Sequence, residues 1–291
     1  MTIMEFRARV SPDDGPAAAL RRTCARFFDA WLPAACIVCG NAHIDGLCPE
    51  CENALPGRAT MRCARCGLAS SASQTSPTPG PVHCAACQAD PPAFSATVVL
   101  GDYAPPLERL VQTLKFGRDA ALAPPLGRAL ARRLETALPD GVRPDASGAS
   151  PGTGAPPGPG APPGPIVTAI PLSPARLAGR GFNQSLEIAR ALARARRLPL
   201  AHRLLVRTRA GTPASTLHAG ERRLALAGAF AAPRSLAART VIVVDDVMTT
   251  GATLRAAADA LRAAGAAHVI NCVVARTPPP DARPDRPRRP G

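Results

Sequence analysis

Long apolar runs, aromatic side chains and lysine are scarce in this sequence of 291 residues. No stretch of about 18 apolar residues occurs, and the opening residues, MTIMEFRARVSPDD, lack the apolar segment of a signal peptide. We therefore expect no membrane span, no export and a cytoplasmic protein. Aromatic residues make up 3% of the chain, so the core should be aliphatic, and few side chains are available to stack on nucleic-acid bases.

The positive charge is carried almost wholly by arginine, because Lys115 is the only lysine and the formal net charge is +14. The planar guanidinium group suits phosphate, which makes a polyanionic ligand or partner an open alternative. Enrichment in arginine and alanine, together with 34 prolines, also follows from a GC-rich genome. Charge alone therefore does not decide whether the chain binds nucleic acid.

Cysteines are concentrated in four Cys-x-x-Cys pairs within about fifty residues, which is a metal-binding pattern. Two such pairs place four thiolates around one tetrahedral zinc ion, so eight thiolates suffice for two structural zinc ions. The repeat of the motifs favours sequential sites, although an interleaved pairing stays open. Disulfides are the alternative, disfavoured because no secretory signal is present. The sequential assignment groups Cys36, Cys39, Cys48 and Cys51 in one site, and Cys63, Cys66, Cys84 and Cys87 in the other.

The most specific motif is VIVVDDVMTTGATL, from Val241 to Leu254. Four β-branched residues predict a strand buried on both faces that ends at the carboxylates of Asp245 and Asp246. A short turn rich in hydroxyl groups should follow, and then a helix that ends at Gly265. The backbone N–H groups of the turn and the positive end of the helix form an anion site. The two carboxylates would repel a phosphate unless they face sugar hydroxyls or Mg²⁺, so the pattern indicates a ribose 5-phosphate with a metal-bound group. An acidic turn that binds magnesium without a sugar is the alternative.

The rest of the chain predicts further elements of an α/β domain. We expect strands at 94–100, 166–170 and 267–275, and helices at 105–116, 122–138 and from Asn183 onward. Cys272 should be a buried apolar residue in the last strand. Residues 17–32 predict a helix, whereas residues 1–16, the Pro/Gly-rich stretch at 139–165 and the tail should be disordered.

A second anion site is predicted from PLSPARLAGRGFNQS, in which Arg176, Arg180 and Gly181 should lie in a loop just after the strand at 166–170. Open parallel sheets bind ligands at the carboxyl ends of their strands, so this loop should face the same crevice as the acidic motif. The arginines would meet the pyrophosphate end of the ligand, although a solvated basic loop would have the same composition.

The acidic motif resembles the signature of type I phosphoribosyltransferases. The resemblance implies that Asp245 and Asp246 hold the ribose hydroxyls of phosphoribosyl pyrophosphate and that the Thr-Thr-Gly-x-Thr loop holds its 5-phosphate. It implies Mg²⁺ as a cofactor that accompanies this ligand. The expected ligand-binding positions are Asp245, Asp246, Met248, Thr249, Thr250, Gly251, Ala252, Thr253, Arg176, Arg180, Gly181 and Lys115. No catalytic residue is assigned.

The order of the four cysteine pairs, YAPPLERLVQTLKF, IPLSPARLAGRGFNQS, RTRAGTPASTLHAGERR and the acidic motif is similar to the ComF family of competence proteins, called GntX in some bacteria. The family implies an open parallel sheet with flanking helices, preceded by a double zinc ribbon. It also implies a role in single-stranded DNA uptake, with a DNA-uptake helicase or other competence proteins as partners. Family members usually carry polar lid-loop residues where this chain has Ala214, Leu224 and Ala225, which weakens the expectation of catalysis more than that of binding.

We therefore expect an N-terminal extension at 1–34, a double zinc ribbon at 35–92, a phosphoribosyltransferase-like α/β domain at 93–277 and a tail at 278–291. Three functions stay open at this point. The chain could bind phosphoribosyl pyrophosphate and single-stranded DNA in DNA uptake, it could transfer a phosphoribosyl group to a nucleobase or other nucleophile, or it could be a zinc-ribbon adaptor with a vestigial ligand site.

Overall fold

The structure is a computed structural model that describes residues 35–58, 60–69, 81–137, 164–208 and 228–278. The predictions for the N-terminal helix, most of the Pro/Gly-rich insertion, the lid positions and nearly all of the tail lie outside these residues. The chain divides into two compact units, residues 1–48 and 49–291. The domain boundaries expected at 34, 92 and 277 stay predictions.

Residues 35–48 of the first unit form a tight cysteine knuckle. Ala35 and Ala42 make an antiparallel bridge, and the N–H of Cys36 donates to the carbonyl of Asn41 at 2.7 Å. The N–H of Gly40 donates back to the carbonyl of Cys36 at 2.9 Å, which closes the turn between the two cysteines of the pair. These backbone bonds hold the Cys36 and Cys39 side chains on one side of the loop.

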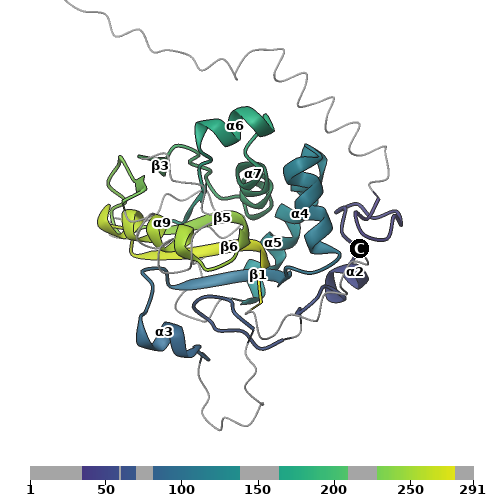
Figure 1. Cartoon of the computed structure of the whole chain (residues 1–291), viewed down its shortest axis with the longest axis horizontal. Helices are drawn as coiled ribbons and strands as arrows, with labels where there is room; N and C mark the ends of the chain where they lie inside the picture. Colours follow the sequence, from purple (N-terminus) through teal and green to yellow (C-terminus); the bar gives the residue numbers. More distant parts are fainter. Residues whose placement is uncertain (1–34, 59, 70–80, 138–163, 209–227, 279–291) are drawn as a thin grey trace, which may run out of the picture. The chain divides into compact units, whose positions relative to one another are not determined.

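The second unit is built on a four-stranded parallel sheet in the order β1-β6-β5-β2 (Figure 1). The strands are β1 (Ala96–Asp102), β2 (Ile166–Ala169), β5 (Thr240–Met248) and β6 (His268–Arg276). Central β5 and β6 are almost wholly buried, as their β-branched sequences predict. A separate antiparallel pair joins β3 (Val206–Arg207) to β4 (Phe230–Ala231).

Helices cover this sheet. The longer ones are α4 (Leu107–Phe116), α5 (Ala123–Ala137), α7 (Gln184–Arg196) and α9 (Ala252–Ala263), and the short 3₁₀ helix η1 (Ala120–Leu122) precedes α5. Helices α5 and α7 pack on each other, with α5 against β1 and α7 against β2 and β5. The two helices approach closely at Gly127, which has no side chain: a Cβ atom there would lie only 2.5 Å from the Cβ of Ala191. None of the helices among the described residues is long and apolar enough to cross a bilayer.

The second cysteine group belongs to the core of this unit. Cys63, Cys66 and Cys87 share one buried cluster with Val243 of β5 and Leu254 of α9. Two short helices, α2 (Pro49–Asn53) and α3 (Ala85–Ala89), begin and end the metal-binding stretch of this unit, residues 49–89. The residues of this metal-binding stretch therefore pack on the α/β domain and do not form a separate core.

Ion pairs also attach this stretch to the sheet and helices. Glu52 of α2 is buried and accepts from Arg132 of α5 at 2.6 Å and from Arg58 at 2.9 Å. Arg62 pairs with Asp102 at the end of β1, at 2.8 Å. Separating the partners of such a pair would leave each charge poorly compensated. These ion pairs therefore hold residues 49–62 against α5 and β1.

Two details of the sequence-based prediction are wrong. Strand β5 does not end at the acidic pair but continues to Met248, because β6 extends to Arg276 and pairs with it along this length. Arg176 and Arg180 do not lie in a loop but on the short helix α6 (Pro174–Arg180). Ser173 caps this helix, Pro174 opens it, and Gly181 ends it in a left-handed conformation with φ of 82°.

Candidate functional site

The acidic pair lies near the carboxyl end of β5, at the edge of the parallel sheet where such folds bind ligands. Asp246 is 5% exposed, whereas Asp245 is half-buried. The following turn is shorter than expected and comprises only Thr249, Thr250 and Gly251 before α9 begins at Ala252. Only a few residues of the chain therefore separate the acidic pair from the start of this helix.

Helix α7 holds the acidic pair through two side chains of its first turn. The Gln184 amide donates to Asp246 Oδ2 at 2.6 Å, and the Ser185 hydroxyl donates to Asp245 Oδ1 at 2.9 Å. The cap residue Asn183 fixes this turn, because its Oδ1 accepts from the N–H of Ser185 while its amide donates to the carbonyl of Ile170 at 3.0 Å. The sequence predicted the cap but missed Gln184 and Ser185. Their signal is the pair of polar residues directly after the cap, on a turn that faces the sheet.

Lys115 supplies a positive charge from the last turn of α4. Its Nζ lies 2.9 Å from Asp246 Oδ1, and its side chain is 19% exposed. Next to it, Phe116 is 73% exposed and lies under the guanidinium group of Arg180, 5.6 Å from the ring centroid. The structure thus brings Lys115 to the acidic pair and Arg180 to the end of the same helix.

The electrostatics of the site are dominated by the two adjacent carboxylates. Burial, and then the charge of Asp246, raise the pKa of Asp245 to about 7, against the lowering effects of Lys115 and the hydroxyl of Ser185. Burial, and then the charge of Arg176, lower the pKa of Arg207, while the charge of Asp245 raises it. Arg176 and Arg207 therefore lie within electrostatic range of each other, and Arg207 within range of Asp245. The sequence did not single out Arg207, whose strand of two residues carries no pattern.

The turn after β5 is tight and leads directly into the N-terminus of α9. Gly251 caps α9 with φ of 80°, and a Cβ there would lie 2.5 Å from the Met248 side chain. Thr249 and Thr250 are exposed, and the Thr250 hydroxyl accepts from the N–H of Ala252 at 3.4 Å. A helix N-terminus with exposed hydroxyl groups favours a phosphate by its dipole and its free N–H donors.

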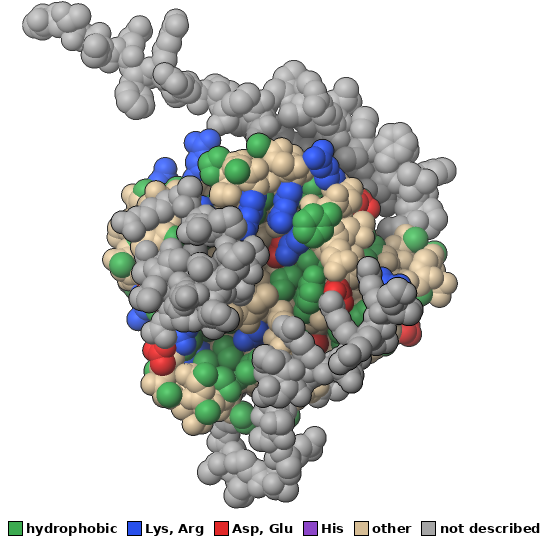
Figure 2. Space-filling view, viewed as in Figure 1, with side chains coloured by type: hydrophobic (Ala, Val, Ile, Leu, Met, Phe, Trp, Pro, Cys, Tyr) green, Lys and Arg blue, Asp and Glu red, His purple; other side chains and the backbone are tan. Residues whose placement is uncertain are grey.

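Figure 2 shows several Lys and Arg side chains gathered over the region of α6, α7 and α4, beside an acidic side chain. This is the side on which the carboxyl ends of β2 and β5 meet the first turn of α7. Positive charge around this carboxylate pair suits a ligand that carries both phosphates and hydroxyl groups.

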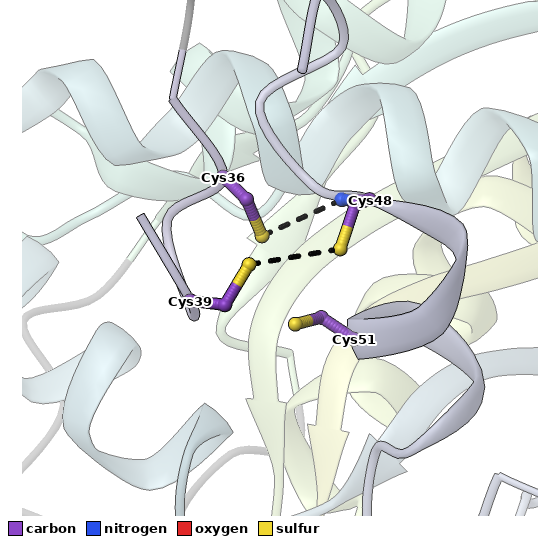
Figure 3. A group of neighbouring side chains, drawn as sticks. All are labelled: Cys36, Cys39, Cys48 and Cys51. Carbon is purple, nitrogen blue, oxygen red and sulfur yellow. Dashed lines mark hydrogen bonds between the residues drawn. The ribbon is translucent and has the colours of Figure 1, made fainter. Parts of the chain in front are cut away.

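The described structure brings eight of its nine cysteines together as two sequential groups of four, and no disulfide joins any of the nine. The four sulfur atoms of the first group, Cys36, Cys39, Cys48 and Cys51, point toward one another (Figure 3). The second group comprises Cys63, Cys66, Cys84 and Cys87, and the sulfurs of each group lie within 4.8 Å of one another.

Both groups fit a tetrahedral zinc ion. A Zn–S bond of about 2.3 Å places tetrahedral sulfurs about 3.8 Å apart. The Cys39 and Cys48 sulfurs are 3.8 Å apart, and those of Cys66 and Cys84 are 3.6 Å apart. Against the opposing effect of burial, backbone hydrogen bonds lower the pKa of Cys36 to about 6. A side-chain hydrogen bond with Cys66 is the main cause that lowers the pKa of Cys63, whereas the same bond and burial raise the pKa of Cys66, and burial raises the pKa of Cys87 to about 12. One thiol in each group, Cys36 and Cys63, is therefore favoured as a thiolate.

Comparisons with known proteins agree with this geometry. The family model described as "Phosphoribosyl transferase domain" matches residues 183–289. The "DNA utilization protein YhgH" of Escherichia coli O157:H7 is 31% identical over 239 residues, which covers 80% of this chain and 91% of that protein. The protein of the same name from Salmonella typhi is 31% identical over 238 residues, with the same coverage. "Competence protein F" of Haemophilus influenzae is 30% identical over 236 residues, which covers 79% of this chain and 91% of that protein.

These similarities extend over about four-fifths of the chain. The parallel α/β sheet and the two groups of four cysteines are the fold expected from the sequence. The chain therefore belongs to the ComF/GntX family of competence proteins.

Proposed function

We propose that this protein binds phosphoribosyl pyrophosphate with Mg²⁺ at the carboxyl edge of its parallel sheet, and that it acts in the uptake of single-stranded DNA in the cytoplasm. The observation that carries the first part is the acidic pair of β5, held by Gln184, Ser185 and Lys115 directly beside the capped turn at Gly251. A vestigial site would have no reason to retain this set of paired contacts around one buried and one half-buried carboxylate.

Each part of the ligand has a partner of matching chemistry. The carboxylates of Asp245 and Asp246 would accept hydrogen bonds from the ribose hydroxyls. The exposed hydroxyls of Thr249 and Thr250 and the N–H groups at the start of α9 would bind the 5-phosphate. Arginines on and near α6 would meet the pyrophosphate, and Mg²⁺ would neutralise part of its charge.

The role in DNA uptake is supported by the family and by charge. The relatives carry the names "DNA utilization protein" and "Competence protein F". The net charge of +14 favours a polyanion, and the paired cysteine groups offer zinc-stabilised loops for contact with it. On this proposal the protein partners are the helicase and other proteins of the DNA-uptake machinery.

Phosphoribosyl transfer is a second candidate function, favoured by the exposed ring of Phe116 under Arg180 and next to Lys115. A planar acceptor could stack there. A deprotonated nitrogen of the acceptor would attack C1 of the ribose, the bond from C1 to the pyrophosphate oxygen would break with its electron pair going to that oxygen, and pyrophosphate would leave. Release of pyrophosphate that depends on both a nucleobase and Phe116 would establish it.

Thermal unfolding in the presence of ligands tests the binding proposal. Phosphoribosyl pyrophosphate with Mg²⁺ should raise the unfolding temperature, since a ligand present at 100 times its Kd stabilises the folded state by about 2.7 kcal/mol. Ribose 5-phosphate and pyrophosphate, each alone, should raise it less, because each fills only part of the site. No change with the complete ligand would mean that the site is vestigial.

A further inference from the structure

A cavity of about 600 Å³ lies at the opposite edge of the sheet from the acidic pair. Ile166, the first residue of β2, and Arg239, directly before β5, both line it. Asp245 follows Arg239 by six positions, and at the rise of an extended strand this corresponds to about 20 Å. The cavity is therefore a separate site from the proposed phosphoribosyl site, and its volume lies in the range of small-molecule pockets, about 300–1,000 Å³.

One wall of the cavity is fixed to β2. The chain after α7 runs along this strand, so that the N–H of Val167 donates to the carbonyl of Pro199 at 2.9 Å and the N–H of Ala201 donates to the carbonyl of Val167 at 2.8 Å. These bonds place the side chains of Leu200 and Leu204 in the lining, next to Ile166. The floor of the cavity is therefore apolar and rigidly held.

The opposite wall is a strained turn. Ala237 and Ala238 both have positive φ, 42° and 60°, in a turn closed by the bond from the N–H of Arg239 to the carbonyl of Leu236 at 2.8 Å. Glycine or asparagine is the usual residue at such positions, so two alanines here are unfavourable. The end of α9 holds the turn, because the N–H of Ala238 donates to the carbonyl of Gly265 at 3.0 Å. A strained conformation that the surrounding structure maintains is typical of ligand-binding segments.

The rim of the cavity carries only positive or neutral polar groups. Arg203, Arg234 and Arg239 line it together with His202, and no acidic residue does. In the described part of the chain, none of these three arginines makes an ion pair with a carboxylate. Elsewhere in this unit arginines such as Arg132 and Arg196 do pair with glutamates. Three uncompensated guanidinium groups around an apolar floor select a ligand with anionic groups and an apolar body.

We propose that this cavity binds a nucleotide of single-stranded DNA, with the base against Ile166, Leu200 and Leu204 and the flanking phosphates on the three arginines. The inference rests on the proposed role in DNA uptake and supplies a surface for it. Only an unpaired base can leave its stack and enter a cavity, whereas a duplex keeps its bases stacked. Guanidinium groups bind phosphate bidentately, so affinity would come from the backbone and the preference for single strands from the cavity.

Two variants of the full chain test the inference by fluorescence anisotropy of a labelled oligo-dT over a series of salt concentrations. The first, the rim variant, carries Arg203→Gln, Arg234→Gln and Arg239→Gln. The second, Ser235→Trp, leaves every charge in place and fills the cavity from an exposed lining residue. The rim variant should lower the slope of log affinity against log salt by about 2, because three single-strand phosphate contacts each contribute about 0.7. At 0.1 M salt this corresponds to binding that is about 100-fold weaker.

The matched control removes the same charge elsewhere. Arg109, Arg194 and Arg197 are exposed, and none of them makes an ion pair within the described residues. Changing all three to glutamine should leave the salt slope close to that of the wild type. Ser235→Trp should weaken binding about tenfold, the loss expected when one base contact of about 1–3 kcal/mol is removed, with an unchanged slope.

The results separate this inference from the proposed phosphoribosyl site. If the rim variant behaves like the control, or if Ser235→Trp binds oligo-dT as tightly as the wild type, the cavity does not hold a nucleotide and the inference is wrong. Titration of the rim variant with phosphoribosyl pyrophosphate and Mg²⁺ should give the affinity of the wild type. Loss of DNA binding with intact binding of this ligand supports the inference, whereas failure of the wild type to bind the ligand would count against the phosphoribosyl proposal alone.

Discussion

Arg276 joins the second cysteine group to the turn at 249–251: the carbonyl of Cys66 accepts from Arg276 Nε at 3.2 Å. The same guanidinium group donates through Nη1 to the carbonyl of Met248 at 3.0 Å and also to that of Thr249. Arg276 is 6% exposed at the end of β6, and its burial lowers the pKa of its side chain. One planar cation therefore satisfies backbone carbonyls of both the metal-binding stretch and the turn beside the acidic pair.

Arg276→Lys should weaken both fold and ligand binding. A lysine ammonium lacks the planar fork, so it cannot reach the carbonyls of Cys66 and Met248 together and leaves a buried acceptor unsatisfied. We expect the free energy of unfolding to fall by about 1–3 kcal/mol and the affinity for phosphoribosyl pyrophosphate to fall as the turn loosens. Denaturant unfolding and calorimetry measure the two effects. Arg109→Lys, at an exposed position, is the control, and equal behaviour of the two variants would contradict the role of Arg276.

Metal analysis should find two zinc ions per chain, because each group of four sulfurs has tetrahedral spacing. The two sites should differ in their effect on stability. Cys66 lies in the buried core cluster with β5 and α9, whereas Cys39 is exposed. Cys66→Ser should therefore cause a large loss of stability of the α/β domain, and Cys39→Ser a much smaller one. Less than one zinc per chain, or equal destabilisation by the two variants, would contradict this assignment.

Lys115 and Asp246 should be energetically coupled. Both side chains are largely buried and their charged atoms are 2.9 Å apart, so Lys115→Met leaves an uncompensated carboxylate. We expect this change alone to destabilise the fold by about 3 kcal/mol. Adding Asp246→Asn should recover part of the loss, because the amide carries no charge. A double-mutant cycle by denaturant unfolding measures the coupling, and strictly additive effects would show that the pair does not interact.

The pKa of Asp245, raised to about 7 by burial and by the charge of Asp246, predicts a pH dependence. Because the pKa of Asp245 is higher in the folded protein than in the unfolded chain, the folded protein binds the proton more tightly. The protonated side chain therefore stabilises the fold fully below about pH 4, and this stabilisation is lost as the pH rises through about 7. Relative to Asp245→Asn, the wild type should therefore lose stability over this range. Ribose hydroxyls require the carboxylate, so affinity for the ligand should rise about tenfold from about pH 6 to pH 8 and binding should release a proton. Calorimetry in buffers of different ionisation enthalpy detects this release, and a pH-independent affinity would contradict it.

The parts of this structure that the sequence predicts are those with strong local patterns. The β-branched run of β5, the Asn183 cap, the sequential cysteine groups and the helix expected from Thr253, which begins at Ala252, are all confirmed. Cysteine spacing and β-branched runs restrict the local geometry of the chain directly. The structure they form can therefore be predicted without knowing which distant segment packs against them.

The parts that could not be predicted depend on contacts between distant segments. Strand β5 continues past Asp246 only because β6 offers partners for the additional residues. The contacts of Gln184 and Lys115 with Asp246 join residues that are 62 and 131 positions apart, the latter from 246 − 115. The helix of Arg176 and Arg180 is only seven residues long, too short for a clear apolar period.

Titration calorimetry with phosphoribosyl pyrophosphate, with and without Mg²⁺, on the wild type and on the Asp245→Asn, Asp246→Asn double variant is the most direct test of the proposed function. Asparagine keeps the size of each side chain while it removes the charge that attracts the ribose hydroxyls and the metal-bound end of the ligand. We expect the wild type to bind one ligand per chain in a Mg²⁺-dependent way, and the double variant to retain only weak phosphate binding. Equal affinity of the double variant and the wild type would contradict the assignment of the site.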